Sequence, residues 1–198
     1  MRARTTTAGL VAVACAGVFL APSSATAAEA PRDKALQGKA GTHCVTDLDT
    51  RKTTCYDTFR ESVTAATGGR VTDATQARAA QDKRFVDTLN ASARAGGPRA
   101  AAELPHVLAI FYSKGDYKGS TWIPRGPLPC ADDGKVNYYM GGLAGGWNDA
   151  ISSLQTAGNC HIRAWEHGEF AGASQYYTTS TRWVGDAMND RISSLEWF

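Results

Sequence analysis

The chain has 198 residues, with 21 Lys and Arg against 19 Asp and Glu. This near-neutral balance, without a long run of charge, excludes the basic footprint of a nucleic-acid-binding protein. The length allows one domain or two small ones. We therefore expect no nucleic-acid partner, and the motifs must supply the functional signal.

Residues 1–27 have the pattern of a secretory signal peptide. Arg2 and Arg4 give a basic start, the apolar run of residues 8–20 is too short to span a membrane, and Ala25-Thr26-Ala27 offers small residues for cleavage. Its removal leaves 19 Lys and Arg against 19 Asp and Glu. We expect a secreted, extracellular protein without a membrane partner.

Four cysteines follow the signal peptide: Cys44, Cys55, Cys130 and Cys160. An even number in an exported chain is typical of disulfides, and three pairings are open. Cys44–Cys55 and Cys130–Cys160 are favoured because each pair lies within one part of the chain. A zinc site is the alternative, but the C-x2-C spacing that would favour it is missing.

The segment before residue 96 is expected to be small and poor in core. Residues 28–41 lack periodicity and predict a disordered leader. The Thr-rich residues 42–58 predict a hairpin closed by the first disulfide. A short helix over 59–67, closed by Gly68-Gly69, and a helix-prone stretch over 74–95 with few large apolar residues complete the segment. Residues 42–95 are thus read as a small disulfide hairpin plus helices.

A domain boundary is expected near Pro105, with residues 96–105 as a linker. Only three aromatic residues lie in 28–105, whereas 14 lie in 106–198. Short β-like segments separated by glycines predict an antiparallel sandwich for the second part. The expected strands lie near 107–112, 118–123, 135–139, 151–155, 160–165, 173–178, 181–184 and 192–197.

An aromatic-glycine hairpin signature occurs twice in the second part. The copies read Tyr112-Ser-Lys-Gly-Asp-Tyr117-Lys-Gly119 and Trp165-Glu-His-Gly-Glu-Phe170-Ala-Gly172. In each, a second aromatic follows five residues after the first and a glycine seven residues after it. The glycines are expected where a positive φ or close packing under a ring excludes a Cβ.

Each hairpin is followed by the string NDxISS, over 148–153 and 189–194. The isoleucine is expected to point inward while the flanking side chains present oxygens. Ca²⁺ prefers six to eight oxygen ligands from carboxylates, hydroxyls, carbonyls and water. A plain Asx/Ser turn is the alternative, but the duplication in register with two hairpins favours a metal-binding role.

With these motifs, residues 106–198 resemble a βγ-crystallin domain. The resemblance implies a mainly β fold, a two-Greek-key βγ-crystallin-like sandwich, here preceded by a small α+β N-terminal segment. It also implies up to two Ca²⁺ ions, each held by the polar loop of one motif and the serine of the other. By position, the ligands would be the side chains of Asp149, Asp190, Ser152 and Ser193 and the carbonyls of Ala150, Arg191, Ser113 and Glu166, with Asn148 and Asn189 bracing the loops.

The two motifs differ in length. The distance from hairpin to polar loop is 36 residues in the first motif (Tyr112 to Asn148) and 24 in the second (Trp165 to Asn189). The 12 extra residues are expected around 124–134 and 140–146, which departs from the compact pattern of the family.

Catalytic patterns are not found, and we expect no enzyme. The glycine-rich stretch 141–146 lacks the strand-turn-helix setting of a dinucleotide loop. There is no G-x-S-x-G elbow, and the histidines do not form H-E-x-x-H. Paired carboxylates for glycosidic chemistry stay open, because their separation in space decides that reaction. The five tryptophans are expected to pack in the core, with a carbohydrate platform as the alternative.

The sequence thus predicts a monomeric, secreted calcium-binding protein in which the ions stabilise the domain. The alternative on the same fold is a protease inhibitor or a killer-toxin-like protein. An inhibitor needs an exposed rigid loop, for which residues 124–134 are the candidate. An enzyme built on the N-terminal segment is a further alternative that its poor core disfavours.

Overall fold

The computed structural model describes residues 42–95, 104–143 and 146–198. The predicted signal peptide (1–27), the predicted leader (28–41) and most of the predicted linker (96–105) lie outside these residues. Among the described residues, no helix has the length and apolar character needed to cross a membrane.

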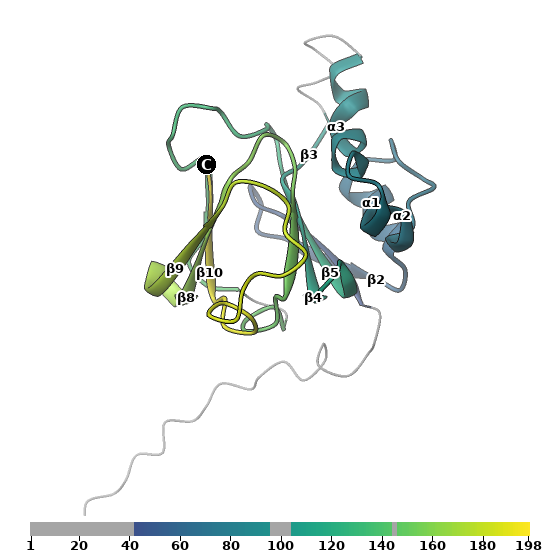
Figure 1. The fold of residues 1–198 in the computed structure, drawn as a ribbon. Coiled ribbons are helices and arrows are strands. Elements are labelled where there is room, and N and C mark those ends of the chain that lie inside the picture. Colours follow the sequence, from purple (N-terminus) through teal and green to yellow (C-terminus); the bar gives the residue numbers. More distant parts are fainter. Residues whose placement is uncertain (1–41, 96–103, 144–145) are drawn as a thin grey trace, which may run out of the picture. The chain divides into compact units, whose positions relative to one another are not determined.

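Two β-sheets face each other, as Figure 1 shows for β8, β9 and β10 opposite β4 and β5. The first sheet has the order β2 (Thr53–Tyr56), β1 (His43–Asp47), β5 (Lys118–Gly126), β4 (Ala109–Lys114) and β7 (Ser153–Thr156), with β3 (His106–Val107) also paired to β5. The second has the order β6 (Tyr138–Met140), β10 (Ser194–Trp197), β8 (Ile162–His167) and β9 (Ala171–Tyr177). The mainly β fold class predicted from the sequence is confirmed.

The two halves of the sandwich exchange strands. β6 belongs to the first sequence repeat but pairs with β10 of the second. Reciprocally, Thr181 of the second repeat forms a β-bridge with Leu154 of the first. Seven of the eight expected strand positions form strands in the described residues, and the eighth, near 181–184, is this single bridge. The exchange brings elements of both repeats to the same end of the sandwich.

The register of the repeats locates the extra residues of the first motif. Leu143 N donates to Ser193 O at 2.9 Å, and Val184 N donates to Ser152 O at 3.0 Å. The same number of residues separates Leu143 from Val184 as separates Ser152 from Ser193. The stretch from β6 to β7 in the first repeat therefore has the same length as the equivalent stretch in the second. The expectation of extra residues around 140–146 is therefore wrong. The whole insertion lies between β5 and β6.

The inserted loop, residues 127–137, is fastened to the sandwich. Cys130 is disulfide-bonded to Cys160, and its amide donates to Gly158 O at 2.8 Å. Tyr138 Oη donates to Leu128 O at 2.8 Å and accepts from Leu128 N at 3.2 Å. The other favoured disulfide, Cys44–Cys55, joins residues directly opposite in the β1–β2 hairpin. Both favoured pairings are thus formed, and all four thiols that a zinc site would need are used.

The N-terminal hairpin extends the first sheet. β1 pairs in parallel with β5, with Cys44 opposite Trp122. Trp122 Nε1 donates to Thr46 Oγ1 at 2.7 Å, which fixes the strand to its neighbour. The sequence does not predict this pairing.

Three helices cover the face of the first sheet that points away from the second. They are α1 (Phe59–Ala66), α2 (Gln76–Gln81) and α3 (Phe85–Ala95). α1 begins with a capping box, because the Thr58 side chain accepts from Glu61 N and the Glu61 side chain accepts from Thr58 N. The helix-prone stretch 74–95 is divided because the chain turns at Asp82, whose carboxylate accepts from Arg84 N at 2.9 Å.

The sequence is apolar at successive positions of β4 because both faces of that strand are covered. Phe111 packs in the core between the sheets, whereas Ile110 and Tyr112 pack against the helices, as the alternation of strand side chains requires. The expectation that the N-terminal segment has little core is accordingly wrong. Its few large apolar residues suffice because the sheet supplies the other half of a shared core. The domain boundary near Pro105 stays a prediction.

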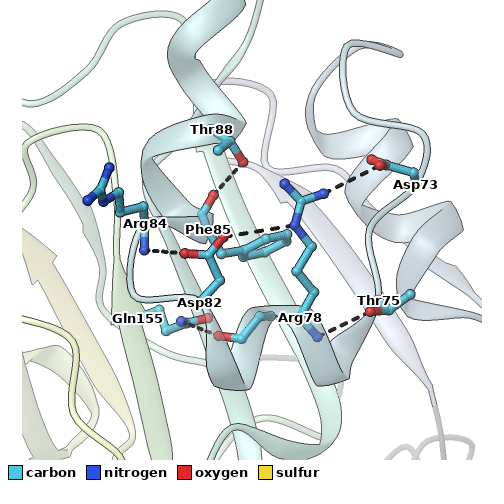
Figure 2. A network of polar contacts seen from close by, with 9 residues as sticks. Asp73, Thr75, Arg78, Asp82, Arg84, Phe85, Thr88 and Gln155 are labelled. Carbon is cyan, nitrogen blue, oxygen red and sulfur yellow. Dashed lines mark hydrogen bonds and ion pairs between the residues drawn. The ribbon is translucent and has the colours of Figure 1, made fainter.

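Polar contacts also join the helices to the sandwich (Figure 2). Gln155 of β7 donates to Ala79 O at 2.9 Å. It also accepts from Tyr112 Oη at 2.5 Å. Around it, Arg78 pairs with Asp73 at 3.4 Å and with Asp82 at 4.0 Å, while its guanidinium lies over the Phe85 ring. The buried bonds of Gln155 fix α2 on the sheet, whereas the exposed ion pairs contribute little.

We predict that Phe85→Ala destabilises the whole described fold. Phe85 is 0% exposed in the core shared by the helices and the sheet, and truncation of a buried Phe costs about 3–5 kcal/mol. Chemical unfolding followed by fluorescence and circular dichroism should show one earlier transition in both signals. Leu128→Ala, at a position 59% exposed, is the control and should change stability by less than about 0.5 kcal/mol. Loss of helical signal alone would contradict the shared core.

Candidate metal centre

The backbone conformation of the two hairpins explains the spacing that they share. In the first, Asp116 and Tyr117 both have φ of 58°, which turns the Tyr117 ring onto Tyr112 at 5.4 Å between centroids. Gly119 has φ of 83°, and a Cβ there would lie 2.4 Å from Ser113 Oγ. Gly172, the equivalent glycine of the second hairpin, also has a positive φ, of 79°. Both glycines are therefore required, as the sequence predicts.

The polar loops bond to each other across the repeat. Asp149 N donates to Ile192 O at 3.1 Å, and Asp190 N donates to Ile151 O at 3.2 Å. Both aspartates adopt the left-handed region, with φ of 55° and 54°, which Asp tolerates better than most residues. The buried isoleucines anchor the loops. Each aspartate is thus presented toward the opposite repeat.

The last serine of each string fastens the loop to its own hairpin. Ser153 Oγ donates to Lys114 O at 2.7 Å and accepts from Tyr117 N at 3.1 Å. Ser194 Oγ repeats this, donating to His167 O at 2.6 Å and accepting from Phe170 N at 3.1 Å. Each hydroxyl donates its single proton and accepts one backbone bond, and these bonds hold the hairpin tip.

The preceding serines face the opposite loop. Ser152 Oγ lies 3.3 Å from Ser113 O and 3.4 Å from Asp190 Oδ1. Ser193 Oγ lies 3.1 Å from Asp149 Oδ1. We call Ser113, Ser152, Asp190 and Arg191 the Asp190 site. We call Asp149, Ala150, Glu166 and Ser193 the Asp149 site.

The asparagines brace the aspartates. Asn148 Nδ2 donates to Asp149 Oδ2 at 2.8 Å, and Asn189 Nδ2 donates to Asp190 Oδ2 at 3.0 Å. Each bond takes one carboxylate oxygen and leaves the other turned toward the serine of the opposite repeat. The bracing role of the two asparagines stays a prediction.

The oxygen chemistry of the Asp190 site fits a hard cation. Ser113 O, Ser152 Oγ and Asp190 Oδ1 converge, but the hydroxyl carries a single proton and can donate to only one of its two neighbours. One of these two acceptor oxygens therefore does not receive that proton, and a cation at this point would interact with the oxygens of all three residues. Carboxylate, hydroxyl and carbonyl oxygens are ligands that Ca²⁺ prefers. Within the described ranges, no three His, Cys, Asp or Glu side chains form a metal cluster, so a cation here would depend on this mixed oxygen set.

One feature of the site is not predicted from the sequence. Arg191 Nη2 donates to Glu166 Oε1 in an ion pair that joins the two sites. The amide of Ala173 donates to Glu166 Oε2 at 3.4 Å, and this bond together with Arg191 lowers the pKa of Glu166 below its ordinary value. The sequence does hold a signal for this pair, because the two repeats differ at these positions. Arg191 corresponds to Ala150 of the first motif, and Glu166 corresponds to Ser113.

The tryptophans pack mostly as expected. Trp122, Trp147 and Trp197 are buried between the sheets. Trp165 lies under the Arg163 guanidinium, whereas Trp183 is exposed and donates to Asp186. The described tryptophans thus do not line up as one exposed carbohydrate platform.

No protein-family model and no curated protein matches the chain. Among solved structures, the chain is similar to a double mutant of a βγ-crystallin domain from Clostridium beijerinckii, with 23% identity, a TM-score of 0.36, and coverage of 46% of this chain and 96% of that one. It is similar to a βγ-crystallin domain from Flavobacterium johnsoniae (21%, TM-score 0.35, coverage 46% and 93%). It is also similar to a βγ-crystallin domain of Abundant Perithecial Protein from Neurospora crassa in the Ca²⁺-bound form (22%, TM-score 0.34, coverage 46% and 87%).

These comparisons confirm the resemblance to βγ-crystallin domains that the motifs predict. The exchanged strands and the repeated hydrogen bonds are features of this chain itself.

We predict opposite roles for neighbouring serines. Ser153→Ala leaves the buried Tyr117 amide without its acceptor and should lower the free energy of unfolding by about 1–3 kcal/mol without added metal. Ser152→Ala removes only the two long contacts at 3.3 and 3.4 Å and should cost less. Thermal melts in chelator measure both, with Ser174→Ala on exposed β9 as the control. Equal losses at Ser152 and Ser153 would contradict the division of roles.

Proposed function

We propose that this protein binds up to two Ca²⁺ ions, one at the Asp190 site and one at the Asp149 site, and that binding rather than catalysis is its function. The observation that carries the proposal is that an aspartate oxygen of one repeat meets a serine hydroxyl of the other at both sites, Asp190 with Ser152 and Asp149 with Ser193, with Ser113 O also beside Ser152. A plain Asx turn would bond its own backbone. Here the aspartate oxygens instead meet the serine of the other motif.

The ligand residues would act in fixed roles. Asp190, Ser152 and the carbonyls of Ser113 and Arg191 would hold one ion. Asp149, Ser193 and the carbonyls of Glu166 and Ala150 would hold the other. The ion would supply positive charge to the carboxylate, hydroxyl and carbonyl oxygens of each site.

The affinity is expected to be modest. Each site contributes one aspartate carboxylate, and sites with few charged ligands in extracellular modules bind Ca²⁺ with Kd on the order of 10⁻⁴ to 10⁻³ M, with sensor-like sites reaching about 10⁻⁵ M. Because the ion binds the folded state, a hundredfold excess over Kd stabilises the protein by about 2.7 kcal/mol per site.

The proposed location is extracellular. Disulfides persist in oxidising compartments, and the two formed here, Cys44–Cys55 and Cys130–Cys160, fasten the hairpin and the inserted loop. The calcium concentration outside cells also suits sites of modest affinity. We expect a monomer.

We predict that Asp149→Asn/Asp190→Asn abolishes the calcium-dependent rise in melting temperature. Asn keeps the left-handed backbone conformation but removes the charge at each site. Thermal melts with excess Ca²⁺ and with chelator measure the effect, and the chelator melts should stay close to wild type. Asp132→Asn, an exposed position on the inserted loop, is the matched control. A calcium shift of wild-type size in the double variant would refute the proposed sites.

A second candidate function is inhibition of a secreted metalloprotease by the inserted loop. Leu128 is 59% exposed although both its backbone groups are bonded to Tyr138 and Cys130 is tied to Cys160. An exposed apolar side chain on a fixed backbone is what an enzyme cleft can accept without a large ordering cost.

For this candidate, titration of secreted metalloproteases should show stoichiometric inhibition that Leu128→Glu weakens at least tenfold. Val136→Glu on the same loop is the control for added charge. Proteases that keep full activity at a large excess of the protein would exclude the inhibitor function.

A further inference from the structure

The two proposed sites share their backbone contacts but differ in two side chains. Ser152 N donates to Tyr112 O and Ser193 N donates to Trp165 O, both at 2.9 Å. The equivalent positions then diverge. Where the first polar loop has Ala150 the second has Arg191, and where the first hairpin has Ser113 the second has Glu166.

These two differences meet in one contact. Arg191 belongs to the loop that carries Asp190, but its guanidinium bonds Glu166 beside the Asp149 site. The arginine side chain is 53% exposed and the glutamate side chain 16% exposed. Glu166 directly follows Trp165, whose carbonyl accepts from Ser193 N. The arginine of one site therefore neutralises a carboxylate at the edge of the other.

We propose that Arg191 is a latch on the Asp149 site: it holds the Glu166 carboxylate in an ion pair and so lowers the calcium affinity of that site. This inference rests on the proposed function. A carboxylate beside a calcium site is a natural ligand, directly or through water. Arg191 on Oε1 and Ala173 N on Oε2 occupy both oxygens of Glu166. Release of the arginine frees an extra negative charge for the ion.

The size of the effect follows from the charges. A carboxylate that moves to within several ångströms of a divalent ion, in a partly exposed and screened setting, gains interaction equivalent to about a tenfold change in Kd. The Asp190 site has Ser113 at the corresponding position and no such carboxylate in its proposed ligand set. Removal of Arg191 should therefore act more strongly on the Asp149 site than on the Asp190 site.

The first experiment is calorimetric Ca²⁺ titration of the full chain with each site isolated. In an Asp190→Asn background, where the Asp149 site remains, Arg191→Ala should tighten binding about tenfold. In an Asp149→Asn background, where the Asp190 site remains, the same substitution removes only the positive charge and should tighten binding clearly less than tenfold. Arg191→Ala keeps the backbone carbonyl proposed as a ligand, so it tests the side chain alone.

The second experiment separates a latch from a simple loss of positive charge. With Glu166→Gln in the Asp190→Asn background, a latch has no carboxylate to release, so Arg191→Ala should lose most of its tenfold gain. A gain of equal size with Glu166 intact and with Glu166→Gln present would overturn the latch. Lys135→Ala is the matched control, because it breaks an exposed ion pair with Asp133 (3.3 Å) on the inserted loop and should leave Kd unchanged.

The outcomes distinguish this inference from the proposed function. Wild-type binding that is unaffected by Arg191→Ala overturns the latch and leaves the two sites standing. Binding that appears at the Asp149 site only after Arg191→Ala supports both. A chain in which neither wild type nor Arg191→Ala binds Ca²⁺ overturns both. Melts in chelator verify that each variant is folded.

Discussion

The structure depends on the reciprocal pair of backbone bonds that joins the polar loops, Asp149 N to Ile192 O and Asp190 N to Ile151 O. Each bond starts in one repeat and ends in the other, so neither loop reaches its conformation without its twin. Both aspartates have positive φ, and their carboxylates lie beside the serines of the opposite repeat. The pairing of carboxylate and serine across repeats is thus a consequence of the exchange of strands, and a cation held there would stabilise the same junction.

The two equivalent strands β5 and β9 differ in the strands that pair with them. β5 and β9 occupy equivalent positions, but β5 accepts β1 in parallel along its second edge, whereas β9 has β8 as its partner among the described strands. The added strand brings the helices over the sheet, which buries Ile110 and Tyr112. An unpaired edge is a liability for a β-protein, and here the N-terminal segment covers one of them while completing its own core. The segment and the sandwich are therefore mutually dependent for burial of apolar surface.

Local patterns in the sequence predict what local physics determines. The glycines of the hairpins and the Cys44–Cys55 pair each depend on nearby residues, and the structure has them as expected. The NDxISS strings depend on contacts across the repeats, and calcium binding there stays a proposal. The parallel pairing of β1 with β5 is not predictable, because Cys44 and Trp122 are 78 residues apart and nothing in a Thr-rich strand specifies its partner. The prediction of extra residues around Met140 is wrong because only hydrogen-bond register, such as Leu143 to Ser193, distinguishes a longer loop from an equivalent one.

The Arg191–Glu166 pair shows why site residues can diverge while the fold does not. At the third position of each string, the proposed ligand is a backbone carbonyl, so the side chain there is free to change without removing an oxygen from its own site. The repeat geometry then directs that side chain toward the neighbouring site, where Glu166 lies. Under the proposed function, a single substitution at such a position would alter the charge beside the opposite site and keep the backbone carbonyl of its own loop. Each loop would then be a place from which the affinity of the other proposed site is set.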